Sequence, residues 1–420
     1  MKETRFKDTE IGQIPEEWIF SKFGDVLRTF SSGATPYRGI PGNFIGNIKW
    51  ITSGELNYKP INDTLEHISE EAVKNTNLTI HQAGTFLMAI TGLEAVGTRG
   101  KCAFVGNPST TNQSCLAING TNKMITSYLF WFYRKYSDLL AFKYCQGTKQ
   151  QSYTASIVRN LPIFHPKDIK EQSRIASALT SVDNLISSLD KLIEKKKNIK
   201  QGTMQQLLTG KKRLKGFSDP WVERKMGRMG STFSGLTGKT KEDFGIGNAK
   251  YITFLNVLSN PILKRELFEE VLVREGEKQN SCHKGDLFFN TTSETPEEVG
   301  ICAMLDTEME SLYLNSFCFG YRLNDDRVVP EYFAYYFRSN EGRKLMTLLA
   351  QGVTRYNMSK SAFINAKLLM PSTVLEQKAI VNVLKGFEKE IEALEVKKAK
   401  FEQIKQGMMQ QLLTGKIRLI

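Results

Sequence analysis

The sequence contains one long internal repeat. Residues 199–214 read IKQGTMQQLLTGKKRL and residues 404–419 read IKQGMMQQLLTGKIRL, so the second copy lies 205 residues (404 minus 199) after the first. The same offset carries Glu171 and Gln172 onto Glu376 and Gln377. A repeat of this length and similarity indicates a tandem duplication, and it requires a fold that is built twice on the same plan.

The two copies have the same residues at scattered scaffold positions, but the residues that lie between these positions differ. Gln146-Gly147 corresponds to Gln351-Gly352, and the segment 112–115 corresponds to 315–318, with Asn at the start and Cys at the end of both. Most of the residues around these positions differ. Such a contrast is expected when one fold presents two different surfaces.

Each copy ends in a heptad pattern that predicts a long helix. Apolar residues at alternating steps of four and three are Ile175, Leu179, Val182, Ile186, Leu189 and Ile193, then Ile380, Leu384, Phe387, Ile391, Leu394, Phe401, Met408 and Leu412. Capping-box spacing and a glycine mark the expected ends, at Asp168, Glu171 and Gly210 and at Thr373, Glu376 and Gly415. Each helix should run about 37 to 40 residues, or roughly 55 to 60 Å at 1.5 Å per residue. A helix of that length is longer than a domain is wide and must project from it, so we expect the two helices to pack on each other.

The segments between these helices have a mixed α+β pattern. Runs typical of strands are residues 49–52, 84–88, 249–255 and 285–289, and runs typical of aromatic-rich helices are 128–144 and 331–349. Aromatic side chains can stack on bases, but at helical spacing they pack more often in a core. We therefore expect core packing for Trp131, Phe132, Tyr335, Tyr336 and Phe337.

The net charge favours a polyanionic partner. The chain carries a formal charge of +13, and a protein that neutralises phosphates releases counterions and gains affinity without sequence preference. Most of the excess lies in residues 171–215, with 10 basic and 4 acidic side chains, and in 376–420, with 9 and 6. Nucleic acid is the first candidate ligand, although a charged helix can equally be a solvated surface.

Composition argues against several classes of protein. The sequence has no run of about eighteen apolar residues that could span a bilayer. Its six cysteines form no C-x-x-C pair and it has four histidines, so we expect reduced, mostly buried thiols and no metal site. Residues 1–18 lack the apolar segment of a secretory signal, so we expect a cytoplasmic protein.

The doubled arrangement closely resembles the specificity subunits of type I restriction-modification enzymes. In that family a globular α+β region precedes a long helix that opens with Glu-Gln and closes with Q-Q-L-L-T-G-K, and the whole is repeated. Further marks are residues 14–18 (IPEEW), 32–36 (SGATP), 146–162 and 351–371. The second copy departs from the pattern at residues 235–238, which lack the proline, and at Trp221, which follows Asp-Pro.

The resemblance covers essentially the whole chain and implies its architecture. It implies an α+β fold with two globular target recognition domains joined by two long antiparallel coiled-coil helices, in a pseudo-two-fold tandem repeat. The parts would be residues 1–167 (first recognition domain), 168–210 (first helix), 211–372 (second recognition domain) and 373–415 (second helix). Each domain would read one half of a bipartite target in double-stranded DNA.

The resemblance also implies that partner proteins carry the chemistry. The chain would join two methyltransferase (M) subunits and two restriction/translocase (R) subunits. S-adenosylmethionine, ATP and Mg²⁺ would bind to those partners, so this chain would have no cofactor, no metal and no catalytic residue of its own.

Sequence motifs agree with a chain that is not an enzyme. An adenine methyltransferase grips the flipped base with an Asn-Pro-Pro-aromatic loop, whereas residues 107–109 read Asn-Pro-Ser and 260–262 read Asn-Pro-Ile. The sequence has no G-x-x-x-x-G-K-[ST] phosphate-binding loop. Glu294, Glu297 and Glu298 could bind Mg²⁺ in a nuclease, but they lack a partnered lysine.

Two other interpretations stay open at this point. One is a self-sufficient nuclease or methylase whose active site is unrecognised. The other is a coiled-coil scaffold that does not contact DNA.

Candidate DNA-binding residues lie in polar loops flanked by glycine. Arg and Lys suit guanine, Asn and Gln suit adenine, and phosphates accept from any basic or amide donor. In the first domain we expect contacts from Thr35, Tyr37, Arg38, Arg99, Lys101, Lys149, Gln150, Gln151 and Tyr153. In the second we expect them from Thr237, Lys239, Lys241, Asn290, Thr291, Thr292, Ser293, Arg355, Tyr356 and Asn357. The loops after Gly147 and Gly352 are the best candidates, because they occupy equivalent positions and differ in sequence.

Overall fold

The computed structural model describes residues 5–95, 97–147 and 151–420. The chain divides into two compact units. The first comprises Met1–Leu189 with Lys397–Ile420, and the second comprises Asp190–Val396. The units are therefore not simply the two halves of the sequence, because the last residues of the chain belong to the first unit.

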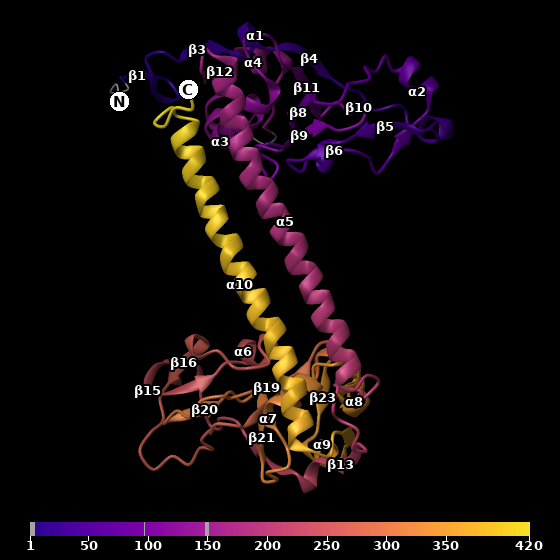
Figure 1. Cartoon of the computed structure of the whole chain (residues 1–420), viewed down its shortest axis with the longest axis vertical. Coiled ribbons are helices and arrows are strands. Elements are labelled where there is room, and N and C mark those ends of the chain that lie inside the picture. The colour runs from indigo at the N-terminus through magenta and orange to yellow at the C-terminus, as the bar shows by residue number, and fades with distance from the viewer. Residues whose placement is uncertain (1–4, 96, 148–150) are drawn as a thin grey trace. The chain divides into compact units, whose positions relative to one another are not determined.

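Two helices of 39 residues each give a segment to both units (Figure 1). They are α5 (Ile169–Leu207) and α10 (Val374–Leu412). Their lengths confirm the expectation from the heptad pattern. Both end three residues before the predicted stop glycines, Gly210 and Gly415.

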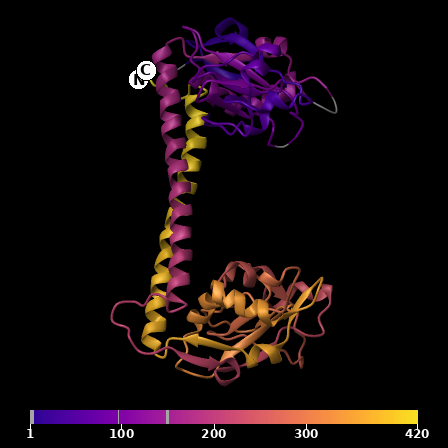
Figure 2. The same cartoon turned by 90° about the vertical axis from the view of Figure 1, so that its right-hand side faces the viewer.

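In the first unit the start of α5 packs antiparallel to the end of α10 (Figure 2). Lys405 on α10 pairs with Asp183 on α5, with 2.9 Å between Nζ and Oδ1. Ile175, Leu179 and Leu412 of the heptad pattern are buried in the core of this unit. Burial of these apolar side chains stabilises the unit, and the ion pair fixes the register of the two segments.

In the second unit the end of α5 packs antiparallel to the start of α10. Lys200 pairs with Glu388, and Lys196 pairs with Glu390, each at 2.6 Å. Ile380 and other heptad residues of α10 are buried here. The same packing is thus built twice, with the two helices exchanging roles.

The first unit holds a five-stranded and a three-stranded sheet. The five-stranded sheet has the order β4-β11-β8-β9-β6, with β4 Arg28–Ser32, β6 Pro60–Ile61, β8 Phe86–Ala89, β9 Cys102–Val105 and β11 Cys115–Asn119. The three-stranded sheet has the order β10-β5-β7, with β5 Ile48–Ile51, β7 His67–Ile68 and β10 Ser109–Thr111. The smaller sheet lies on the side of the unit away from α5 (Figure 1).

The second unit repeats this plan. Its four-stranded sheet has the order β14-β21-β17-β19, with β14 Gly230–Ser234, β17 Leu287–Asn290, β19 Cys302–Met304 and β21 Cys318–Leu323. One of its two three-stranded sheets has the order β16-β15-β20, with β15 Phe244–Ile252, β16 Phe268–Val271 and β20 Leu312–Leu314. In both units the strand of the small sheet that comes last in the sequence runs parallel to its neighbour. In the first unit β10 is parallel to β5, and in the second β20 is parallel to β15.

The remaining helices and strands complete the units. Those of the first are β1 Phe6–Thr9, β2 Gly12–Pro15, β3 Ile19–Lys22, α1 Phe23–Val26, α2 Glu70–Asn75, α3 Thr126–Tyr144, α4 Ala155–Asn160 and β12 Pro162–His165. Those of the second are β13 Val222–Lys225, α6 Phe254–Ser259, β18 Thr292–Ser293, α7 Pro330–Tyr336, α8 Asn340–Leu349, β22 Ala350–Gln351, β23 Tyr356–Met358, α9 Lys360–Asn365 and β24 Lys367–Met370. Together they confirm the α+β prediction.

One predicted helix is two helices. The aromatic-rich run 331–349 is split into α7 and α8, because Ser339 begins a new helix by accepting a hydrogen bond from the backbone N–H of Gly342. The expected core packing is confirmed, since Trp131, Phe132, Tyr335, Tyr336 and Phe337 are all buried. Residues 249–255 were predicted as one strand. Instead, strand β15 ends at Ile252 and helix α6 begins at Phe254.

The repeated Glu-Gln pair joins each helix to its globular region. Gln172 is buried and its side chain accepts from the N–H of Ile125, and Gln377 does the same for Val329. The Asp168–Glu171 and Thr373–Glu376 pairs were predicted to form capping boxes. At the second helix the N–H of Glu376 donates to Oγ1 of Thr373 at 3.4 Å, which is half of such a box. The two glutamate carboxylates accept hydrogen bonds from arginines that follow the helices, Arg418 on Glu171 and Arg213 on Glu376.

Within the part of the chain that the structure describes, no helix is long and apolar enough to cross a membrane. All six cysteines are free, and five of them are buried. Burial raises the pKa of the Cys102 thiol to about 12, so this thiol stays protonated. The expectation of mostly buried thiols is thereby confirmed.

Candidate nucleic-acid interface

A β-turn with two central residues, the two-residue turn, connects the small sheet to the large sheet in each unit. It lies between β10 and β11 in the first unit and between β20 and β21 in the second. Asn112 begins the first turn, and its Oδ1 accepts from the N–H of Ser114 at 3.1 Å. Asn315 begins the second, and its Oδ1 accepts from the N–H of Phe317 at 2.9 Å. The same side-chain-stabilised turn is therefore built twice.

These turns connect the loops in which DNA contacts were predicted. In the first unit the N–H of Ala34 donates to the carbonyl of Thr111, and the N–H of Ile90 donates to the carbonyl of Ser114. Thr91 in turn forms a β-bridge with Ser152. We call these connected loops the first loop row, which consists of residues 34–38, 90–95, 97–101, 112–114, 146–147 and 151–153.

The second unit has the equivalent set of contacts. The N–H of Leu236 donates to the carbonyl of Leu314, and the N–H of Thr291 donates to the carbonyl of Phe317. β18 then pairs with β23, with Thr292 opposite Asn357. The second loop row is made of residues 236–241, 290–293, 315–317 and 351–357. The structure thus brings together the three groups of candidates that the sequence predicted in each domain.

Arg38 and Thr35 lie in the first loop row, and both side chains form hydrogen bonds within the protein. Arg38 forms two hydrogen bonds with Glu66, at 2.9 and 2.8 Å, and its guanidinium lies 4.4 Å from the ring centroid of Phe44. This pairing lowers the pKa of Glu66. Thr35 donates its hydroxyl to Oε1 of Gln113 at 2.5 Å. Tyr37 is largely exposed.

Arg99 and Gln151 meet in the same row. Arg99 donates Nε to the carbonyl of Leu93 at 3.0 Å and Nη2 to Oε1 of Gln151 at 3.2 Å. Both side chains are partly exposed, and so is Lys101. The arrangement joins two loops that are 52 residues apart in sequence.

Tyr153 differs from the prediction. It is only 3% exposed and belongs to the core of the first unit. Burial raises the pKa of its hydroxyl far above the ordinary value. It is a core residue, as is Met358 at the equivalent position of the second unit. Two further candidates, Lys149 and Gln150, lie outside the described residues.

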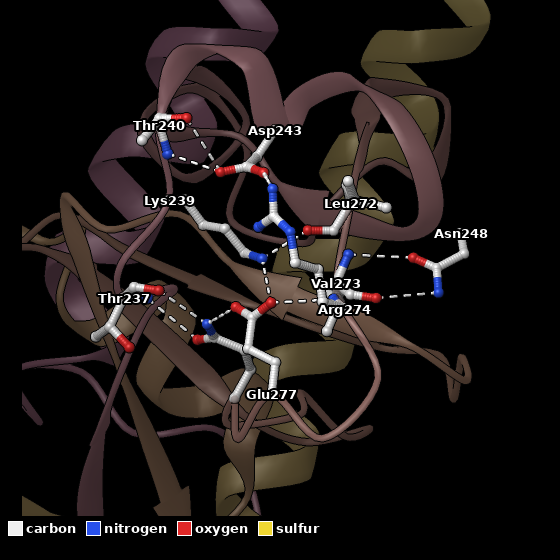
Figure 3. A network of polar contacts seen from close by, with 10 residues as sticks. Thr237, Lys239, Thr240, Asp243, Asn248, Leu272, Val273, Arg274 and Glu277 are labelled. Carbon is white, nitrogen blue, oxygen red and sulfur yellow. Dashed lines mark hydrogen bonds and ion pairs between the residues drawn. The ribbon is translucent and has the colours of Figure 1, made fainter.

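Lys239 was predicted to contact DNA but its side chain is only 3% exposed. Its ammonium pairs with Glu277 at 2.6 Å and donates to the carbonyl of Leu272 at 2.6 Å (Figure 3). The hydrogen bond from Lys239 lowers the pKa of Glu277 to about 2. Nearby, Arg274 pairs with Asp243 at 2.7 Å. The lysine therefore ties two loops of the domain together instead of facing solvent.

Asn290 is likewise buried and serves the fold. Its Oδ1 accepts from the N–H of Ile301 at 2.7 Å, and its Nδ2 donates to the carbonyl of Glu298 at 2.8 Å. Ser293 donates to the Glu298 carboxylate at 3.0 Å. These bonds shape the acidic loop 294–298, which was considered as a Mg²⁺ site. Among the described residues no group of three or more His, Cys, Asp and Glu could hold a metal ion.

The remaining candidates of the second row are more accessible. Arg355 is exposed in the hairpin that joins β22 to β23, and Tyr356 and Asn357 follow it on β23. Gly352 has φ +134°, and a Cβ there would meet the carbonyl oxygen of Arg355, so the hairpin requires glycine. Thr237 and Lys241 are exposed, while Thr291 and Thr292 are partly exposed.

The turn residues themselves were missed by the sequence interpretation. The two middle positions of the turn are Gln113 and Ser114 in the first unit and Ser316 and Phe317 in the second. The signal was present, because both turns start at Asn and end at Cys while their two middle residues differ. The match was interpreted as scaffold, and its variable centre was not considered as a site.

Comparison with known proteins assigns the family. A model of the type I restriction modification DNA specificity domain matches the chain twice, at residues 15–201 and 218–403. The chain belongs to this family. It is 27% identical over 439 residues to the putative type I restriction enzyme MjaX specificity subunit of Methanocaldococcus jannaschii, covering 100% of this chain and 98% of that protein. It is 22% identical over 449 residues to the MjaVIII specificity subunit of the same organism, covering 100% and 97%.

Solved structures from type I restriction-modification systems show the same fold. The S subunit of a type I restriction-modification system from M. genitalium matches with a TM-score of 0.58 at 11% identity, covering 96% of this chain and 97% of that one. A second structure, from work on complex assembly and conformational transition of the type I R-M system, matches with a TM-score of 0.60 at 14% identity, covering 96% and 99%. At these identities the likeness concerns the fold alone.

Proposed function

We propose that this specificity-family member selects the DNA site at which a type I restriction-modification complex acts. Each globular domain reads one half of a bipartite target in double-stranded DNA. The observation that carries the proposal is the pair of loop rows. They share their backbone hydrogen bonds but differ in their side chains, as expected of one scaffold that recognises two different sequences.

The chemistry of modification and cleavage belongs to partner subunits in this proposal. The chain binds two methyltransferase subunits and two restriction/translocase subunits, and S-adenosylmethionine, ATP and Mg²⁺ bind to those partners. Support comes from the family match over both halves and from the absence of methyltransferase and phosphate-loop motifs in the sequence. The chain itself has no catalytic residue in this proposal.

The test is to co-express the chain with the methyltransferase from the same genome and to map methylated adenines in the host DNA. We expect one bipartite sequence to be methylated, and neither protein alone to methylate it. Turnover by the purified chain alone with DNA, S-adenosylmethionine, Mg²⁺ and ATP would show a self-sufficient enzyme instead. Failure of the joint complex to protect its own site more than a scrambled one would favour a scaffold without DNA contact.

A further inference from the structure

The two-residue turn is the best matched element of the two loop rows. In both units a buried or partly buried Asn starts the turn and a buried Cys follows it, at Cys115 and Cys318. The residue at its second position, Ser114 or Phe317, offers its carbonyl to the neighbouring loop in the same way. The backbone is therefore fixed from both sides. What differs between the units is the pair of side chains at the tip.

Phe317 presents an apolar group in a row of polar loops. The residue is 59% exposed although its backbone is held by Asn315 and Thr291. The ring is supported edge-on by Phe254, with 6.4 Å between centroids and 78° between planes. An aromatic group that is held in place but remains exposed can contact an apolar surface of a ligand without reorganising the protein.

Gln113 presents an amide at the matching turn of the first unit. It is exposed, and the hydroxyl of Thr35 holds its Oε1. A carbonyl-type oxygen has two lone pairs, so Oε1 can accept a second hydrogen bond while Nε2 donates. An oriented amide with one acceptor and one donor has the geometry that pairs with the N6 and N7 edge of adenine.

We infer that the tip of this turn is a specificity-determining element of each domain, with Phe317 contacting the 5-methyl group of a thymine and Gln113 contacting the major-groove edge of an adenine. The inference rests on the proposed function. In the major groove the thymine methyl is the apolar feature that separates an A·T pair from a G·C pair, and Phe is one of the side chains that suit it. Thr35 is a positioning residue that acts through Gln113.

The first experiment uses the complete complex with its methyltransferase and maps methylated sites in the host genome. Phe317→Ser, which copies the first unit, should relax one A·T position in one half-site and leave the other half-site unchanged. Phe317→Leu keeps an apolar contact and should keep the preference. The matched control is Leu369→Ser, because Leu369 is 53% exposed on β24, outside the loop row. Gln113→Ala should relax one position in the opposite half-site.

The second experiment removes single atoms from the DNA and measures binding by the wild-type complex. Deoxyuridine replaces each thymine of the half-site in turn, and one replacement should weaken binding about fourfold, the effect of losing one buried methyl-sized group. The Phe317→Ser complex should bind the thymine and uracil duplexes equally. 7-Deazaadenine, which lacks the N7 acceptor, should weaken binding at one position in the other half-site by about 5- to 150-fold, and Gln113→Ala should abolish this difference.

Thr35 has its own control pair. Thr35→Val removes the hydroxyl and should reduce the discrimination against 7-deazaadenine, whereas Thr35→Ser should restore it. A merely structural role would lower stability in both variants without changing the choice of base.

The outcomes separate this inference from the proposed function. A wild-type complex that methylates no specific sequence contradicts the proposed function. A wild-type complex that methylates a bipartite site overturns the inference if Phe317→Ser and Gln113→Ala leave both half-sites unchanged. The inference is also overturned if replacing thymine by deoxyuridine weakens binding at no position of either half-site. This second test uses only the wild-type complex, so it decides even if the variants fail to assemble.

Discussion

Arg418 donates two hydrogen bonds to the carboxylate of Glu171, from Nε to Oε1 at 2.5 Å and from Nη2 to Oε2 at 2.8 Å. Glu171 lies in the first turn of α5, whereas Arg418 follows the end of α10. The second unit repeats the contact with Arg213 and Glu376, at 2.5 and 2.7 Å. The tail of each repeat therefore closes on the start of the helix from the other repeat.

Replacing Arg418 by alanine should destabilise the first unit strongly. The substitution leaves the Glu171 carboxylate, which is buried, without its counter-ion, and breaking a buried pair in this way costs about 3 to 5 kcal/mol. The measurement is urea unfolding, with hydrogen exchange to locate the loss in the first unit. The control is Lys416→Ala at an exposed position. Equal stability of the two variants would contradict the structural role of the pair.

Gly415 and Gly407 should respond to alanine in opposite directions. Gly415 has φ +69°, and a Cβ would lie 2.3 Å from Cγ of Pro15, so Gly415→Ala should destabilise the first unit. Gly407 lies inside α10, where a Cβ would have open space around it. Gly407→Ala should therefore stabilise the helix, by about 0.5–1 kcal/mol. The measurement is the thermal unfolding midpoint of both variants. A higher midpoint for Gly415→Ala than for the wild type would contradict the prediction.

The Lys239–Glu277 pair should make the second unit sensitive to acid. Hydrogen bonding by Lys239 lowers the pKa of Glu277 from 4.5 to about 2. Because the pKa is lower in the folded state, the stabilisation is fully present above pH 4.5 and is lost as the pH falls toward 2. Glu277→Gln should lose less stability than the wild type over this range, as measured by urea unfolding at each pH. Parallel pH profiles of the two proteins would argue against the pair.

The two recognition domains should be exchangeable. Replacing residues 216–370 by the equivalent region of a relative should change one half of the methylated sequence and leave the other half as it was, because each unit has its own core. The methylated sites of the chimaera and the parent would be mapped in the same host. A change in both halves would be inconsistent with one domain for each half-site.

Arg355→Ala should weaken binding to one half-site. If Arg355 contacts a guanine edge, the loss should be about 1–3 kcal/mol with relaxed preference at one position. If it contacts a phosphate, affinity should fall evenly across sequences and the salt slope should decrease by about one unit. Binding at several salt concentrations separates the two, with Lys344→Ala on α8 as an exposed basic control. Unaltered binding would remove the β22–β23 hairpin from the recognition surface.

Long-range periodicity made much of the fold predictable. The heptads predicted both 39-residue helices to within a few residues, because every buried position of a long helix repeats the same information. The internal repeat also related the two units to each other, since matching residues recur at a nearly constant offset. The division of residues 331–349 into α7 and α8 was missed, because it depends on a local cap at Ser339 within an otherwise helical pattern.

The candidate site was less predictable, because exposure is a property of tertiary neighbours. Lys239 looked like any loop lysine, and it is buried because Glu277, 38 residues later, lies beside it. Asn290 and Tyr153 were chosen for side chains that suit bases, yet both are buried within the fold. Phe317 was overlooked for the opposite reason, since an aromatic residue is expected in a core until its exposure is known.

The discontinuity of the first unit has a consequence for how the protein is made. A ribosome synthesises residues 190–396, the whole second unit, as one uninterrupted stretch, so the core of that unit needs no residue that is made later. Synthesis of the first unit begins earlier, but this unit also needs residues 397–420, which are made after the whole second unit. Until then Ile175 and Leu179 lack part of their apolar cover and Glu171 lacks Arg418. The unit whose synthesis begins first thus has its last segment made only after the whole second unit.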